Sequence, residues 1–432
     1  MKKYLNTISA FQFSQLIRFS QLILIGVVFT KTALSQQTIG EYETFTFVAG
    51  AVSFFWLNGL LKALLPMAAE TKNKPYFLFS SFILIQLLSL ITVGLLAILT
   101  PLFSDVLLNG KSIPAITLIL LFIALSVPAN LVEYYYLIQK KNKSLLGYAL
   151  TSNLFQFILV AGPAILNYDL SVLLKGLVLS AALRYLWLWY ILVSKSKFRV
   201  SVVFIREHLK LGGPLVVATL LSGSAQFIDG FIVTSHFNEE AFAVFRYGAR
   251  ELPLATLLAN ALSNAMLSEF GATQNLKRSL QKLKQSVNRL MHFLFPTTAI
   301  LLLISKPIFP LIFNANFANS ASIFNVYLLL IVSKLLMPQT ILNGRKITRP
   351  IMFASFFELT LNVMLSLIFV QLCGLTGIAM ATFIAYLFEK IFLAVVVKQR
   401  LGVNIKHYLP VKNYLIYSSG IVVIFIFAEL IF

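Results

Sequence analysis

YFLFSSFILIQLLSLITVGLLAILTP, residues 76–101, contains no charged side chain. A helix of about 20 apolar residues crosses a hydrocarbon core about 30 Å thick, so this segment is long enough to span a bilayer. The whole chain has a matching composition, since 59% of its 432 residues are hydrophobic and 12% are charged. A soluble domain carries about twice that share of charge. The sequence therefore predicts an all-α integral membrane protein.

Apolar runs of similar length recur along the chain and predict thirteen spans, within a range of twelve to fourteen. The span at 240–269 is unusual because it carries Arg246, Arg250 and Glu251. The predicted spans are residues 11–33, 42–66, 76–101, 114–139, 145–167, 172–194, 209–235, 240–269, 290–313, 319–343, 350–373, 375–398 and 411–432.

Most basic residues lie in the loops between these spans. The net charge of +20 would suggest nucleic-acid binding in a soluble protein. Here, alternate loops hold 24 Lys and Arg residues, whereas the loops on the opposite side hold four. Because cytoplasmic loops are enriched in Lys and Arg, the alternation predicts a cytoplasmic N-terminus and no nucleic-acid partner. The C-terminus is expected outside if the last run crosses the membrane.

The longest basic loop is GATQNLKRSLQKLKQSVNR, residues 271–289. Its pattern predicts a basic amphipathic helix that lies on the anionic inner leaflet with its lysines among the head groups. A calmodulin-type target or a nucleic-acid site is the sharper alternative for the same segment.

Signatures of catalysis and metal binding are nearly absent from the chain. The single cysteine, Cys373, excludes an intrachain disulfide and argues against a thiolate metal cluster. The four histidines are far apart and have no metal-ligand spacing. We therefore expect no cofactor, no metal and no enzymatic activity.

The two halves of the chain resemble each other. NGLLKALLPMAAE at 58–70 is similar to NALSNAMLSEFGA at 260–272, and Pro128 and Pro338 each precede a basic loop. The two offsets, 202 and 210 residues, agree within small gaps. Six spans followed by six spans predict a parallel repeat, with two bundles related by a pseudo-twofold axis and a cavity between them. Chance similarity between apolar helices is the alternative.

Seven basic residues remain inside the predicted spans, where ionisable groups are costly and usually face a bundle interior or a wet cavity. Arg246 and Arg250 are four residues apart and are expected to share one helix face. Arginine binds phosphate with two parallel hydrogen bonds and keeps its charge in a low-dielectric site. Lys62 could instead reach the inner interface, and Arg184 could pair with an acid on a neighbouring helix. Lys390 follows Glu389 and is expected to belong to a charged pair with other spans. The predicted substrate-binding cations are Arg18, Arg246, Arg250, Lys62, Lys334 and Arg184.

Acidic residues inside the spans are candidates for coupling sites, where a bound proton or cation drives a conformational change. The candidates are Asp229, Glu133 and Glu358. Structural ion pairing with the arginines is the alternative role for each of them.

Three stretches resemble the Wzx-type polysaccharide flippases of the multidrug/oligosaccharidyl-lipid/polysaccharide exporter superfamily. They are Gly40-Glu41-Tyr42 with the following GLLKALLPMAAE, LKLGGPLVVATL at 209–220, and FIDGFIVTSHFNEEAFAVFRYGARE at 227–251. Asp229 and Arg250 fall on patterned positions of that family, and Arg18 falls where its members often have a cation. The resemblance implies a two-lobed fold like that of the MATE and MurJ transporters: lobes at 1–200 and 201–400, and an extra helix at 401–432.

The resemblance also implies a function. The expected substrate is an undecaprenyl-pyrophosphate-linked oligosaccharide, flipped by alternating access across a bacterial inner membrane for O-antigen, lipopolysaccharide or capsule synthesis. Proton or sodium coupling, membrane lipids, a polysaccharide polymerase and glycosyltransferases are the implied partners. A drug or cation antiporter and a lipid II flippase are rivals within the superfamily. A membrane-embedded glycan polymerase or acyltransferase is the rival from a different class.

Overall fold

The computed structural model describes residues 7–71, 74, 76–107, 110, 113–250, 253–272, 276–345 and 347–431. Helices make up 88% of the structure, and these ranges contain no strand. The predicted all-α fold is therefore confirmed. The helices form two compact units, Met1–Ala243 and Val244–Phe432.

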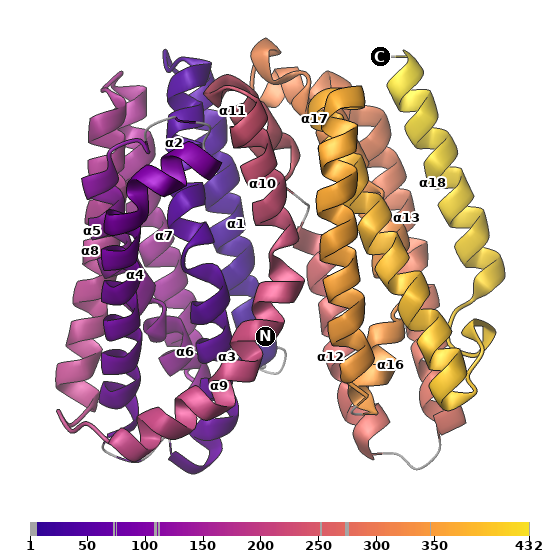
Figure 1. The fold of residues 1–432 in the computed structure, drawn as a ribbon, viewed down its shortest axis with the longest axis horizontal. Helices are drawn as coiled ribbons and strands as arrows, with labels where there is room; N and C mark the ends of the chain where they lie inside the picture. Colours follow the sequence, from indigo (N-terminus) through magenta and orange to yellow (C-terminus); the bar gives the residue numbers. More distant parts are fainter. Residues whose placement is uncertain are drawn as a thin grey trace. The chain divides into compact units, whose positions relative to one another are not determined.

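The first unit contains ten complete helices among its described residues. Within it α1 packs along α7, α5 along α8, and α3 along α9. Helix α9 packs closely on α3, so α9 and α10 belong to the first compact unit, which ends at Ala243. The sequence predicts a lobe boundary earlier, at residue 200. The helices are α1 Thr7–Lys31, α2 Gln36–Ala51, α3 Phe54–Thr71, α4 Phe77–Leu107, α5 Ile116–Ala129, α6 Leu131–Ile138, α7 Asn142–Ile165, α8 Leu170–Lys195, α9 Val202–Gly223 and α10 Ala225–His236 (Figure 1).

Helix α11, Glu239–Gly248, contains the boundary between the units. The second unit is built around α13, which packs against α18, α14 and α12. Its helices are α12 Pro253–Ala272, α13 Leu276–Ile312, η1 Ala315–Phe317, α14 Ser320–Leu328, α15 Leu330–Lys334, α16 Pro338–Gly344, α17 Arg349–Leu401, η2 Ile405–His407 and α18 Val411–Ile431 (Figure 1).

The apolar helices are those of a multi-pass membrane protein. Eight helices in the described ranges are long and apolar enough to cross a bilayer, and two bent pairs, α2–α3 and α14–α16, raise the number to ten. Each of the thirteen predicted spans corresponds to a helix or a broken helix in the structure. However, α9–α10 and α11–α12 are not among the sufficiently apolar segments, so the count of thirteen crossings stays a prediction.

Helix α17 is a hairpin rather than one long rod (Figure 1). Gly374 has φ +59° and ψ −136°, a conformation that ends a helix and that glycine adopts without steric cost. A Cβ on Gly377 would lie 2.1 Å from the carbonyl oxygen of Phe369, and Asn362 Nδ2 donates to Thr382 Oγ1 at 2.9 Å. In a continuous helix these last two residues would lie about 30 Å apart. The predicted break between 373 and 375 is therefore confirmed.

Several helices are interrupted at proline, and neighbouring side chains bind the exposed backbone. Pro128 in α5 has no N–H, which leaves the carbonyl of Ala124 without its helical partner. Gln86 Nε2 from α4 donates to that carbonyl at 3.5 Å and replaces the missing bond, and Ser89 of α4 also donates to the preceding carbonyl, of Ile123, at 3.1 Å. Such replacement bonds are needed because lipid offers none.

The interruptions recur at equivalent places in the two sequence halves. The bend of 50° between α2 and α3 has its counterpart in the break between α11 and α12, where residues 251 and 252 lie outside the described part. The interruption between α5 and α6 corresponds to the one between α15 and α16, at Pro338. This recurrence supports the predicted parallel repeat.

The basic segment 271–289 does not form a separate helix on the membrane surface. From Leu276 onward it continues into the following span as one 37-residue helix, α13. At 1.5 Å per residue, α13 is about 55 Å long, well beyond a hydrocarbon core of about 30 Å. The predicted surface helix is therefore wrong, and the basic residues form the projecting end of a long helix.

The contact between α3 and α9 depends on glycine. A Cβ on Gly59 would lie 2.6 Å from the Cα of Val216, and one on Gly212 would lie 2.6 Å from Leu60 Cδ2. Helices in membranes associate through close backbone approach at small residues, because lipid supplies little hydrophobic driving force. The two glycines therefore allow the closest approach in this pair.

Gly59→Ala is expected to destabilise the first unit by about 1–3 kcal/mol, because the added methyl group overpacks a contact with backbone atoms. Thermal unfolding of the purified protein in a mild detergent measures the change. Gly94→Ala in α4 is the matched control, because a Cβ there meets nothing within 4 Å. Equal unfolding temperatures for both variants would contradict the role of Gly59.

Candidate functional site

Two predicted site residues, Arg18 of α1 and Glu133 of α6, form a salt bridge. Arg18 Nη2 donates to Glu133 Oε1 at 2.6 Å, and Gln15 Nε2 donates to Oε2 at 3.4 Å. The Glu133 side chain is 7% exposed, whereas that of Arg18 is 35% exposed. The pair therefore holds a buried carboxylate, while about a third of the Arg18 side chain stays exposed.

Arg184 of α8 lies close to this pair. It donates to Gln156 Oε1 of α7 and, at 3.5 Å, to Ser180 Oγ, while its buried Nε has no hydrogen-bond partner among the described residues. Tyr148, Arg18 and Glu133 lie within electrostatic range of its charge. An acid on a neighbouring helix was the alternative partner for Arg184. In the structure the neighbouring helix α7 instead provides an amide, that of Gln156.

The other two candidates of the first unit lie in different surroundings. Lys62 of α3 is exposed, which agrees with the alternative that its ammonium reaches the interface. Asp229 of α10 is completely buried, five residues after the interruption at Ser224. The carboxylate of Glu133 accepts from Arg18 and Gln15, and the structure thus brings Arg18, Glu133 and the nearby Arg184 together.

Arg246 and Arg250 do not share a helix face. Arg246 lies in the last turn of α11, whereas Arg250 lies two residues beyond the end of that helix at Gly248. Pro253 begins α12 and favours a break immediately before it. Arg250 stacks on Tyr247, with its guanidinium carbon 4.4 Å from the ring centroid. The prediction of one shared face is therefore wrong.

Lys334 of α15 lines a cavity of about 230 Å³ within the second unit. Its Nζ donates to Thr256 Oγ1 of α12 at 2.8 Å. Thr297 and Thr298 of α13 also line the cavity, whose other walls are largely apolar, including Tyr327 and Phe324. The arrangement is an ammonium among hydroxyl groups in an otherwise apolar space.

Lys390 and Glu358 of α17 are two further intramembrane charges of the second unit. Lys390 donates to the adjacent Glu389 at 2.5 Å and to Gln339 of α16 at 3.0 Å. The ion pair thus lies within α17, whereas the sequence predicted a charged pair with other spans, and the contact with another helix is to an amide. Glu358 of α17 is 3% exposed. Its predicted coupling role stays a prediction.

The sequence did not predict one further polar cluster, formed by Glu429 of α18. Its carboxylate accepts from Lys306 at 2.9 Å, Ser322 at 2.9 Å and Asn325 at 2.8 Å. Ser305 extends this Glu429 cluster by donating to Asn325 Oδ1 at 2.6 Å. The sequence does show the polar residues Ser305, Ser322 and Asn325 inside two otherwise apolar spans, and these could have indicated a buried polar cluster. Among the described residues no group of His, Cys, Asp and Glu could hold a metal ion.

The fold is that of transporters of the MOP superfamily. Over 98% of this chain and 93% of the other, the structure superposes with a TM-score of 0.76 on the lipid II flippase MurJ in its inward closed conformation, at 20% sequence identity. A MOP superfamily transporter from Pyrococcus furiosus matches with a TM-score of 0.62 at 16% identity, over 92% of this chain and 95% of its own. An inward-facing multidrug-resistance MATE transporter matches with the same score and identity, over 90% of this chain and 98% of its own.

The sequence family narrows the class of protein further than the fold does. A family model described as polysaccharide biosynthesis protein matches residues 33–322, about two thirds of the chain. The chain is thus a member of this polysaccharide biosynthesis family, as the resemblance predicted. No curated protein sequence matches it.

Proposed function

We propose that this protein flips a lipid-linked oligosaccharide from the cytoplasmic to the outer leaflet of a bacterial inner membrane. The substrate is an undecaprenyl-pyrophosphate-linked glycan of O-antigen or capsule type. The observation that carries the proposal is the partly accessible Arg18 held on buried Glu133 in a chain of the polysaccharide biosynthesis family. An accessible guanidinium within an apolar bundle suits a substrate whose charge is a pyrophosphate.

The Arg18–Glu133 pair provides a mechanism for coupling. Phosphate oxygens of the substrate compete with the Glu133 carboxylate for the same guanidinium. A carboxylate that loses its cation in a poorly solvated site is stabilised by binding a proton. Substrate binding and proton binding are then linked through one pair of residues, while Gln15 and Arg184 adjust the polar surroundings.

The cations of the second unit act on the substrate in the same way. Lys334 and Arg250 offer positive charge from α15 and from the segment before α12. Several cations of moderate affinity let the pyrophosphate transfer from one to the next, whereas one very strong site would retain it.

Lys334→Met tests the second cation. Methionine has similar length and suits the apolar walls of the 230 Å³ cavity, so the change in stability is expected to stay within about 1 kcal/mol because the cost of a buried charge disappears as well. Glycan export is expected to fall at least about tenfold. Thr256→Val is the matched control: it removes the hydroxyl partner but keeps the charge. Normal export by Lys334→Met would rule out the role of this lysine.

The overall function is tested by deleting the gene in its host. Loss of surface glycan with accumulation of undecaprenyl-linked glycan on the cytoplasmic leaflet is expected, and a plasmid copy should reverse both effects. Intact surface glycan together with altered sensitivity to cationic compounds would instead identify an antiporter. The buried acids Glu133, Asp229 and Glu358 are the observation that favours this second candidate.

A further inference from the structure

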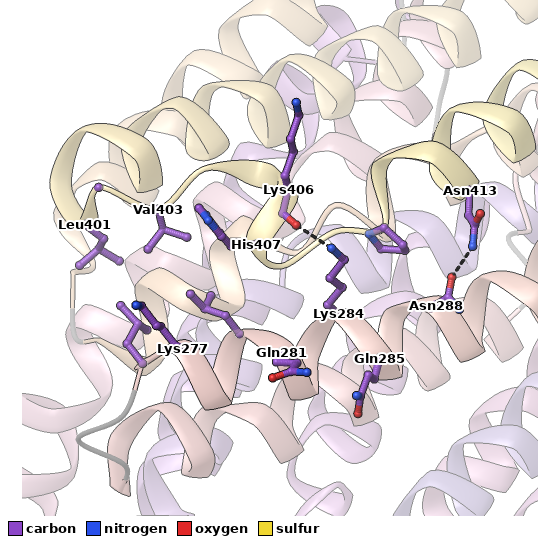
Figure 2. Close-up of a pocket in the computed structure, with 14 residues that line it drawn as sticks. Lys277, Gln281, Lys284, Gln285, Asn288, Leu401, Val403, Lys406, His407 and Asn413 are labelled. Atoms are coloured by element: carbon purple, nitrogen blue, oxygen red, sulfur yellow. Dashed lines mark hydrogen bonds between the residues drawn. The ribbon is translucent and has the colours of Figure 1, made fainter.

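A cavity of about 790 Å³ lies at the projecting end of α13, and none of the predicted substrate-binding or coupling residues lines it. One wall is the first part of α13, and the other is the segment 401–413 that connects α17 to α18 through η2 (Figure 2). The size is in the usual range of small-molecule sites, about 300–1,000 Å³.

The lining has the composition of an anion site. Lys277 and Lys284 of α13 and His407 of η2 contribute basic groups, Gln281 contributes an amide, and none of the fourteen lining residues is acidic. Lys284 Nζ donates to the carbonyl oxygen of Lys406 at 2.8 Å, which orients it across the cavity (Figure 2). An ammonium has three donors, so two remain for a ligand.

The same cavity has an apolar component. Leu280, Leu401 and Val403 line it beside the basic groups. The two helices that flank the cavity, α13 and α18, expose large apolar side chains beyond it. Phe293 on α13 is 51% exposed and Leu415 on α18 is 59% exposed. From Lys284 to Leu290, where the apolar part of α13 begins, the distance along the helix axis is about 9 Å. Lys284 therefore lies at about the depth of a head-group layer, about 5–8 Å, and Lys277 lies about two helical turns further out.

We propose that this cavity binds the head group of an anionic phospholipid. The phosphate lies between Lys277 and Lys284, the amide of Gln281 binds the glycerol oxygens, and the acyl chains follow the exposed apolar faces of α13 and α18. A free phosphate could use the same two lysines, but it would leave the apolar walls unfilled. The bound lipid joins α13 to the segment before α18 at one end of the second unit.

The test is a titration of the purified full-length chain in a neutral detergent, followed by native mass spectrometry. The probes are phosphatidylglycerol, phosphatidylcholine with the same acyl chains, and inorganic phosphate. The variant Lys277→Gln/Lys284→Gln is expected to weaken phosphatidylglycerol binding about 30-fold, given the usual contribution of a basic residue at an anionic lipid surface. The matched control is Arg278→Gln/Lys282→Gln on the same helix, which makes the same charge change at residues that do not line the cavity.

Saturable binding of phosphatidylglycerol that falls only in the cavity variant supports the proposal. An equal fall in both double variants would mean general attraction to a basic helix and would overturn it. So would equal binding of phosphatidylcholine, or displacement of the lipid by inorganic phosphate at similar concentration. Gln281→Glu provides a second variant that keeps both lysines and introduces a negative charge into the cavity; unchanged phosphatidylglycerol binding there also contradicts the proposal.

Discussion

Arg18→Ala is expected to lower export of the lipid-linked glycan by more than about 100-fold. Two charge-assisted hydrogen bonds to phosphate are lost, and each contributes about 1.5–3 kcal/mol. Arg250→Ala added to the same chain is expected to abolish the remaining export. Accumulation of the lipid-linked intermediate on the cytoplasmic leaflet is the direct measurement, together with protein level in the membrane fraction.

The control for this experiment separates binding from folding. Arg18→Ala alone leaves the buried carboxylate of Glu133 without its cation, which by itself destabilises a protein. Arg18→Ala/Glu133→Gln removes both charges and is expected to recover the protein level and the unfolding temperature, but not export. If the double variant exports at the wild-type rate, the pair has only a structural role and Arg18 does not bind substrate.

Glu429→Ala is expected to cause the largest loss of stability, about 2–5 kcal/mol. The Glu429 cluster joins α18 to α13 and α14 through three donors, and a hydrogen bond between membrane helices contributes about 0.6–1.7 kcal/mol. The variant also leaves the ammonium of Lys306 without its carboxylate. Thermal unfolding in detergent gives the size of the effect, and limited proteolysis of the segment 402–410 reports release of α18.

Glu429→Gln is the matched control for this cluster. The amide oxygen can still accept from Asn325 or Ser322, and only the ion pair with Lys306 is lost. A loss of about 1 kcal/mol or less is expected. If alanine and glutamine lower the unfolding temperature equally, the ion pair dominates; if neither lowers it, the cluster does not hold α18.

The positions of the helices could be predicted from the sequence because the length of an apolar run reports a membrane span directly. The turn at Gly374 is an example, since one glycine separates two runs of span length. The continuity of α13 could not be predicted in this way. Hydropathy separates the basic residues 277–289 from the apolar residues that follow, although no glycine or proline lies where they join and they form one helix.

The pairing of charges was beyond the sequence for a different reason. Arg18 and Glu133 are 115 residues apart and on different helices. Which side chains meet depends on the rotation of each helix about its axis, and in a membrane both the lipid-facing and the buried sides are apolar, so no periodic signal defines that rotation. The same reason explains why the Glu429 cluster was not predicted, although its polar residues were visible.

The recurring interruptions in α2–α3, α5–α6, α11–α12 and α14–α16 have a mechanical consequence. Bending an intact helix strains its i to i−4 hydrogen bonds, but at an interruption the helix is already broken, and beside Pro128 the side chain of Gln86 replaces one such bond. The angle at each break can therefore change at low cost in enthalpy. These interruptions recur at the same places in both sequence halves. Bending a helix at an interruption in one half should therefore cost about as much free energy as bending the equivalent helix in the other half. Two end states that exchange such bends would have similar free energies, which is what a transporter needs in order to cycle.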